Sequence, residues 1–85
     1  MNTLEFINSQ TELQFSDSTE RNDETDSISS KLGELTVRIW LPNKDYNWFS
    51  VGLIDLKHDL DWFYLSEQLT ITQVIELVTS LKLKS

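Results

Sequence analysis

The sequence contains no cysteine and has only two glycines and one histidine. Without cysteine the chain has neither a disulfide framework nor a thiolate metal site, so the burial of apolar side chains must hold the fold together. Gly33 and Gly52 cannot form the glycine-rich loops that bind phosphate or the glycine-flanked turn of a nucleophile elbow. Phosphate cradles and nucleophile elbows are thereby excluded.

Long apolar runs and basic residues are also scarce. No stretch approaches the ~20 apolar residues of a membrane span, and Glu5 lies where a signal peptide would need an apolar run. We therefore expect a soluble, cytoplasmic protein. Seven Lys and Arg against 14 Asp and Glu leave a net charge of −7, which repels nucleic acid and anionic membranes but attracts basic proteins.

The composition is otherwise that of an ordinary globular domain, with 39% hydrophobic and 25% charged residues. A chain of 85 residues forms a single domain, residues 1–85. We predict an α+β fold in the order ββ-loop-βββα, a small antiparallel sheet of about five strands with one C-terminal helix packed on one face. Its parts are an N-terminal hairpin (1–16), an acidic loop (17–32) and a βββα core (33–85).

The N-terminal segment has an alternating apolar pattern that favours a hairpin. Pairing Leu4 with Phe15 and Phe6 with Leu13 collects these four side chains on one face and leaves Ile7 on the other. A helix is the competing interpretation of the same residues.

The stretch SDSTERNDETDSISSK, residues 16–31, contains five acids, two bases and one apolar residue, Ile28. Ser, Thr, Asp and Asn side chains compete for backbone hydrogen bonds and favour turns, so we expect a long mobile loop. Three roles are open: a solvated connector, a docking strip for a basic partner, or a nucleic-acid mimic whose carboxylates replace phosphates.

Three strands and a helix are expected after the loop. If Trp40 pairs with Trp48, one apolar face collects Leu35, Val37, Ile39, Phe49, Val51 and Leu53. The third strand is expected to place Phe63 opposite Leu53, Leu65 opposite Val51 and Tyr64 opposite Gly52, with Asp55 facing Asp61. Residues 70–84 indicate a helix with Thr70 as N-cap and Gln73 at the capping-box position. Its apolar stripe consists of Ile71, Val74, Ile75, Val78 and Leu81.

Catalytic chemistry finds little support in this sequence. His58 with Asp59 and Asp61 could form a metal or acid-base site, but three ligands on one tight turn are weak evidence, and a solvated hairpin tip is favoured. We therefore expect no enzyme activity, no metal and no cofactor.

The aromatic residues provide a stronger indication of function. The expected registers place Trp40, Trp48, Trp62 and Tyr64 on the sheet face away from the helix, where Trp and Tyr would form a binding hot spot. Alternatively, the N-terminal hairpin covers this face and makes it a second small core. The expected partner-binding residues are Trp40, Trp48, Trp62, Tyr64, Asp17, Glu20, Asp23, Glu24 and Asp26.

In size, acidity and strand-rich plan the chain is similar to small bacterial immunity proteins and phage-encoded inhibitors of host enzymes. We accordingly expect a non-catalytic binding protein that neutralises a basic nuclease, toxin or nucleic-acid-handling complex. The alternative is a structural or assembly subunit that forms a homodimer through its aromatic sheet face.

Overall fold

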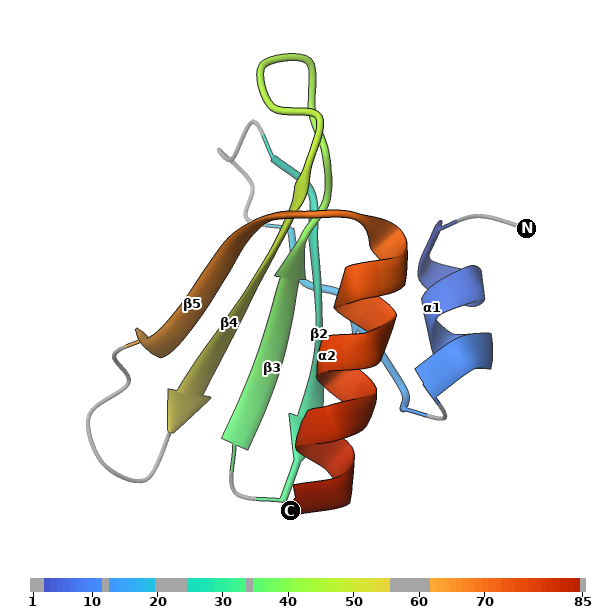
Figure 1. The fold of residues 1–85 in the computed structure, drawn as a ribbon, viewed down its shortest axis with the longest axis vertical. Coiled ribbons are helices and arrows are strands. Elements are labelled where there is room, and N and C mark those ends of the chain that lie inside the picture. The colour runs from blue at the N-terminus through green and yellow to red at the C-terminus, as the bar shows by residue number, and fades with distance from the viewer. Residues whose placement is uncertain (1–2, 12, 20–24, 34, 56–61, 85) are drawn as a thin grey trace.

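A computed structural model describes residues 3–11, 13–19, 25–33, 35–55 and 62–84. The elements in chain order are α1 (Thr3–Thr11), β1 (Ser16–Asp17), β2 (Ser27–Leu32), β3 (Leu35–Trp40), β4 (Phe49–Asp55), β5 (Trp62–Leu69) and α2 (Ile71–Lys84). The five strands form one antiparallel sheet in the order β1-β2-β3-β4-β5 (Figure 1). The α+β fold predicted from the sequence, with a C-terminal helix on the sheet, is confirmed. No helix in the described part of the chain is both long and apolar enough to cross a membrane.

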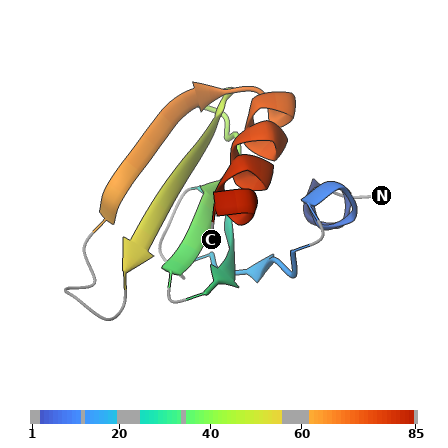
Figure 2. The ribbon, with the colours of Figure 1, turned by 60° about the horizontal axis from the view of Figure 1, so that its bottom comes forward.

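Both helices lie on the same face of the sheet, so the molecule has two layers (Figure 2). α1 contacts α2, and α2 contacts β4 and β5. The core between the layers consists of Ile7, Phe15, Ile28, Leu32, Val37, Ile39, Val51, Leu53, Val74 and Val78. The docking of α2 on the apolar sheet face therefore agrees with the sequence pattern. We call the opposite side of the sheet the open face, and it carries Arg38, Trp40 and Ser50.

The start of α2 has the predicted capping box. The Gln73 backbone N–H donates to Thr70 Oγ1 at 3.2 Å, and the Thr70 backbone N–H donates to Gln73 Oε1 at 2.8 Å. Two backbone donors that helix geometry leaves without partners are thus satisfied. Val74 and Val78 are fully buried, and Leu77 joins Ile71 and Leu81 in packing against the core.

Removing the Thr70 cap should destabilise the fold measurably. We expect Thr70→Ala to lower the free energy of unfolding by about 1 kcal/mol, because an N-cap hydroxyl is lost. Thr72→Ala is the matched control, since Thr72 is exposed within the helix and alanine has the higher helix propensity there. Urea titration measures both changes, and equal stabilities for the two variants would contradict the role of the cap.

The expected N-terminal hairpin is wrong, because residues 3–11 form the helix α1. Helical spacing places Leu4, Ile7 and Thr11 on one side, and Ile7 is fully buried while Phe6 is 36% exposed. The Asn8 side chain then receives the returning chain, accepting from the Phe15 N–H at 2.7 Å and donating to the Phe15 carbonyl at 3.1 Å. A side-chain amide thereby replaces the backbone pairing that a hairpin would have supplied.

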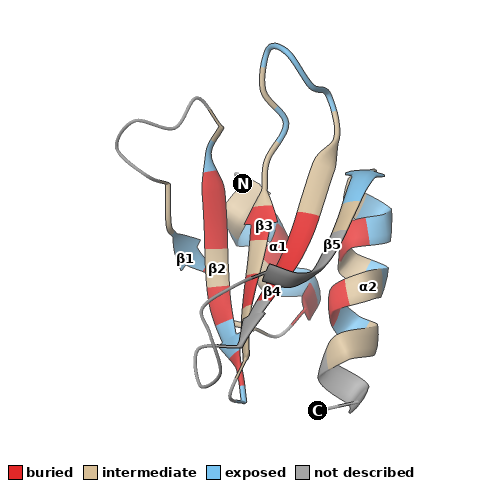
Figure 3. Ribbon diagram, turned by 90° about the vertical axis from the view of Figure 1, so that its left-hand side faces the viewer, coloured by how far each residue is buried: buried red, intermediate tan, exposed pale blue. Residues whose placement is uncertain are grey.

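The expected acidic loop is also wrong over much of its length. Residues 27–32 form β2, an inner strand, and residues 16–17 form the short edge strand β1. Ile28 is only 3% exposed and pairs with Ile39. Figure 3 shows β2 mostly in the colour of buried residues. β3 pairs with the whole of β2, and β1 pairs with Ile28 and Ser29. This pairing satisfies much of the backbone of the polar segment, so it becomes ordered with few apolar side chains. Residues 20–24 lie outside the described part of the chain.

The β3–β4 register differs from the expected one by two residues. Val37 pairs with Leu53, Ile39 with Val51, and Trp40 with Ser50 rather than with Trp48. A shift of two keeps every side chain on its face, so the predicted apolar face survives the error. The connection is longer than the expected turn and leaves Trp48 outside the paired strand.

Between Val51 and Leu53, the β4–β5 register differs from the expected one by one residue. Tyr64 pairs with Leu53 and Leu65 with Gly52, whereas Phe63 had been expected opposite Leu53. The pairing also shifts between Phe49 and Val51 and between Leu53 and Ile54. Such shifts cannot be read from apolar alternation alone. The expected facing of Asp55 and Asp61 lies outside the described residues.

Candidate protein-binding surface

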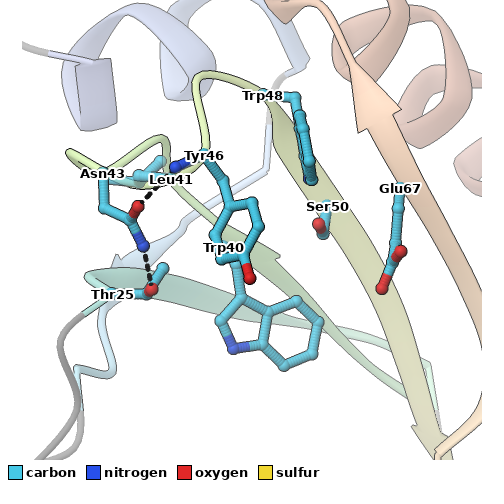
Figure 4. Close-up of a pocket in the computed structure, with 8 residues that line it drawn as sticks. All are labelled: Thr25, Trp40, Leu41, Asn43, Tyr46, Trp48, Ser50 and Glu67. Carbon is cyan, nitrogen blue, oxygen red and sulfur yellow. Dashed lines mark hydrogen bonds between the residues drawn. The ribbon is translucent and has the colours of Figure 1, made fainter.

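A hollow of about 450 Å³ opens on the open face beside the β3–β4 connection (Figure 4). We call it the aromatic hollow. Its lining residues are Thr25, Trp40, Leu41, Asn43, Tyr46, Trp48, Ser50 and Glu67. They come from β3, β4, β5, the β3–β4 connection and the residue two before β2. Distant parts of the chain therefore meet at one place on the side of the sheet away from α1 and α2.

The hollow brings together two of the predicted binding residues, Trp40 and Trp48, both half-buried. It adds Tyr46, which the set predicted from the sequence omitted. The Tyr46 and Trp48 rings are tilted by 48° with centroids 4.9 Å apart, and Tyr46 is 54% exposed. The spacing of two residues between Tyr46 and Trp48 was the available signal. Trp48 also borders a second hollow of about 570 Å³ near the start of α2.

Asn43 organises the connection that presents Tyr46. The Asn43 Oδ1 accepts from the backbone N–H groups of Asp45 at 2.7 Å and Tyr46 at 2.8 Å. The backbone N–H of Asn43 donates to the Tyr46 carbonyl at 2.8 Å. Its Nδ2 donates to Thr25 Oγ1 (Figure 4). Asparagine commonly forms turns of this type because its amide copies a backbone hydrogen bond. One side chain thus fixes the turn and joins it to the segment before β2.

A β-bulge positions Glu67 at the hollow. Phe49 pairs with Leu69 and Val51 with Ser66, so two residues of β5, Glu67 and Gln68, oppose the single Ser50. Gln68 has φ of 58°, a left-handed conformation that non-glycine residues adopt at an energetic cost. The extra residue lets Leu69 reach the core while Glu67 lines the open face.

Arg38 stands next to Trp40 on the open face. Its guanidinium carbon is 5.4 Å from the Trp40 ring centroid. Its Nε and Nη2 donate to the buried Ser27 Oγ at 3.0 and 2.9 Å, and Nη2 also donates to the Ser18 carbonyl at 2.8 Å. This arginine connects β3 to β2 and to the residue after β1, and holds one side of the Trp40 ring.

Two of the predicted acidic residues, Asp17 and Asp26, lie in the described part of the chain. Asp17 is exposed on β1, where its Oδ1 accepts from the Thr19 hydroxyl at 2.7 Å and the Thr19 N–H at 2.9 Å. These hydrogen bonds lower the pKa of Asp17 below its ordinary value. Asp26 is exposed, and its carbonyl accepts from the Leu41 N–H at 2.9 Å, close to the hollow. Glu20, Asp23 and Glu24 lie outside the described residues.

The remaining predicted sites are only partly described. Trp62 and Tyr64 belong to β5, but their side chains lie outside the described part, as do His58, Asp59 and Asp61 altogether. The segment considered as an alternative cover for the aromatic face forms α1, which packs on the same side of the sheet as α2. Within the described residues, no group of three His, Asp or Glu side chains could hold a metal ion. No family model, curated protein or solved structure matches this chain.

Proposed function

We propose that this chain is a non-catalytic protein-binding module that binds a basic partner on its open face. The observation that supports this proposal most directly is the aromatic hollow on the side of the sheet away from both helices. The function would be to inhibit or sequester a basic nuclease, toxin or nucleic-acid-handling complex by occupying part of its surface.

The chemistry of the hollow favours a protein as the ligand. Tryptophan and tyrosine are the residues most enriched in binding hot spots, and half-buried rings at a concave site can enclose a partner side chain. The Asn43 hydrogen bonds hold the connection in shape before binding, which reduces the entropy lost on association. The volume of about 450 Å³ is suited to one or two inserted side chains.

The charge of the chain favours a basic partner. Its net charge is −7, the hollow is bordered by Glu67, and the described residues that line it include no Lys or Arg. A field of one sign raises the association rate of an oppositely charged protein and discriminates against acidic ones. Asp26 and Asp17 are exposed and contribute to the same field.

Binding to a purified partner should depend on the tryptophans of the hollow. Affinity capture from the host extract supplies a candidate, which is then titrated as a pure protein by surface plasmon resonance. We expect Trp48→Ala to weaken binding at least ~30-fold, mainly through faster dissociation, if Trp48 is a hot spot worth ~2 kcal/mol. Phe6→Ala is the matched control, because Phe6 is an exposed aromatic on α1, on the opposite side of the sheet. Folded Trp48 and Trp40 variants with unchanged affinity would refute the proposal.

The acidic segment provides a second arm of the same experiment. Neutralising Asp17, Glu20, Asp23, Glu24 and Asp26 together should slow association and flatten its dependence on salt, because exposed charges act within about 8 to 10 Å. The dissociation rate should change little. A loss of affinity through dissociation alone would instead make these residues direct contacts.

Homodimerisation through the aromatic hollow is the second candidate, since the rings that line it could pack against a second copy. The net charge of −7 on each copy opposes that association at low salt. Sedimentation equilibrium across concentration separates the two cases. A dimer lost on Trp48→Ala would favour the assembly subunit.

A further inference from the structure

The aromatic hollow combines ring faces with one carboxylate, and this combination is selective for organic cations. We propose that it receives a cationic side chain, the alkylammonium of lysine or the guanidinium of arginine, from the partner. This inference rests on the proposed function and names the group that the open face recognises. The cation would lie against the Trp48 ring with Glu67 as its counter-ion.

The first support is the nature of the walls. Trp40, Tyr46 and Trp48 all border the same space, and the faces of aromatic rings carry negative potential that attracts cations within about 6 Å. The long apolar stem of lysine or arginine would contact the rings while its charged end stays near the mouth. A neutral apolar side chain would gain the ring contacts but not the electrostatic attraction.

The second support is the position of Glu67. Along a regular β5 pleat, Glu67 and Leu69 would lie on one face, yet Leu69 packs against the core and Glu67 lines the hollow. The bulge that separates them requires Gln68 at φ 58°. Bulges of this kind commonly re-aim a side chain at a functional site. Here the carboxylate is placed across Ser50 from Trp40 and Tyr46 (Figure 4).

The third support is that one ring of the hollow already has a cation near it. Arg38 lies 5.4 Å from the Trp40 centroid and is held there by hydrogen bonds to Ser27 and Ser18. Its charge disfavours a second cation on that side of Trp40. The incoming group is therefore expected at the Trp48 and Glu67 side, which is where we place it.

Capped pentapeptides test the inference directly. The probes are acetyl-GGKGG-amide, acetyl-GGRGG-amide and the uncharged counterpart with norleucine at the centre, titrated at constant ionic strength. The tryptophan indole N–H signals in two-dimensional NMR spectra report occupancy. We expect the lysine and arginine peptides to shift the Trp48 signal in a saturable way. The norleucine peptide should bind about two- to fivefold more weakly, the range of a solvent-exposed cation–π contact. Equal affinities for norleucine and the cationic probes would overturn the inference.

Three variants assign the effect to the hollow. Glu67→Gln should weaken cationic probes about two- to fivefold without changing norleucine binding, while Glu76→Gln, an exposed acid on α2, should change neither. Trp48→Leu should remove the cation preference. If Trp48→Leu does not fold, Tyr46→Ala replaces it as the test, because Tyr46 is largely exposed, and the preference for cationic probes is measured on that variant. Equal effects of Glu67→Gln and Glu76→Gln would overturn the role of Glu67 and the inference with it.

The outcomes also separate this inference from the proposed function. If a purified partner loses binding with Trp48→Ala while norleucine and lysine peptides bind equally, the cation inference fails and the protein-binding function stands. If cationic peptides bind at Trp48 but every purified basic partner binds the tryptophan variants with wild-type affinity, the proposed function fails.

Discussion

Replacing Val78 with aspartate should unfold the protein or lower its free energy of unfolding by several kcal/mol. Val78 is fully buried on α2 against the sheet, in one cluster with Val37 and Val51. An aspartate there would place a charge among apolar groups, and such burial without a partner is among the most costly single changes. A small domain has a free energy of unfolding of about 5 to 15 kcal/mol. The decrease expected for Val78→Asp is therefore a large fraction of the total stability.

Thermal denaturation followed by circular dichroism measures this effect. Thr79→Asp is the matched control, because it adds the same charge one residue later at an exposed position of the same helix. We expect Thr79→Asp to melt near the wild-type temperature. A Val78→Asp protein with an unchanged melting point would contradict the docking of α2.

Ile7→Ala should be far more destabilising than Phe6→Ala, although phenylalanine is the larger residue. Ile7 is fully buried in the core, and truncating a buried isoleucine typically costs about 2 to 5 kcal/mol. Phe6 is 36% exposed on the other side of α1, and truncation there should cost roughly 1 kcal/mol or less. The N-terminal hairpin expected from the alternating pattern reverses this order, because it faces Phe6 to the core.

Urea denaturation of the two variants decides between these arrangements. The ratio of the two losses in free energy of unfolding is more informative than either loss alone, because both variants shorten neighbouring side chains of one short segment. A greater loss for Phe6→Ala would contradict the helix α1. Equal slopes of the unfolding curves would show that the comparison reports stability rather than a change in the unfolded state.

The two tryptophans of the hollow could be predicted from the sequence, whereas its other lining residues could not. Trp40 and Trp48 were expected on the face away from the helix because alternation along a strand assigns faces, and the hollow contains both. The exact register was not needed, since the error of two residues leaves the faces unchanged. Tyr46 and Glu67 were missed because their positions depend on the Asn43 turn and on a bulge, features that apolar alternation does not encode.

Local patterns by themselves determined the helix α2 and the strand of residues 35–40, although not the registers of β4 with its neighbours. The α2 capping box and its apolar stripe, and the strand of residues 35–40, depend on contacts between near neighbours or on strong periodicity. Tertiary structure decided the N-terminal half. Residues 3–11 satisfy both a period of two and a helical spacing, and only packing of Ile7 against α2 and the sheet selects the helix. Residues 27–32 are ordered because β3 pairs with all of them and β1 pairs with Ile28 and Ser29. Both partners lie outside the segment, so the energy that orders these polar residues comes from pairing with β1 and β3 and cannot be found within the segment itself.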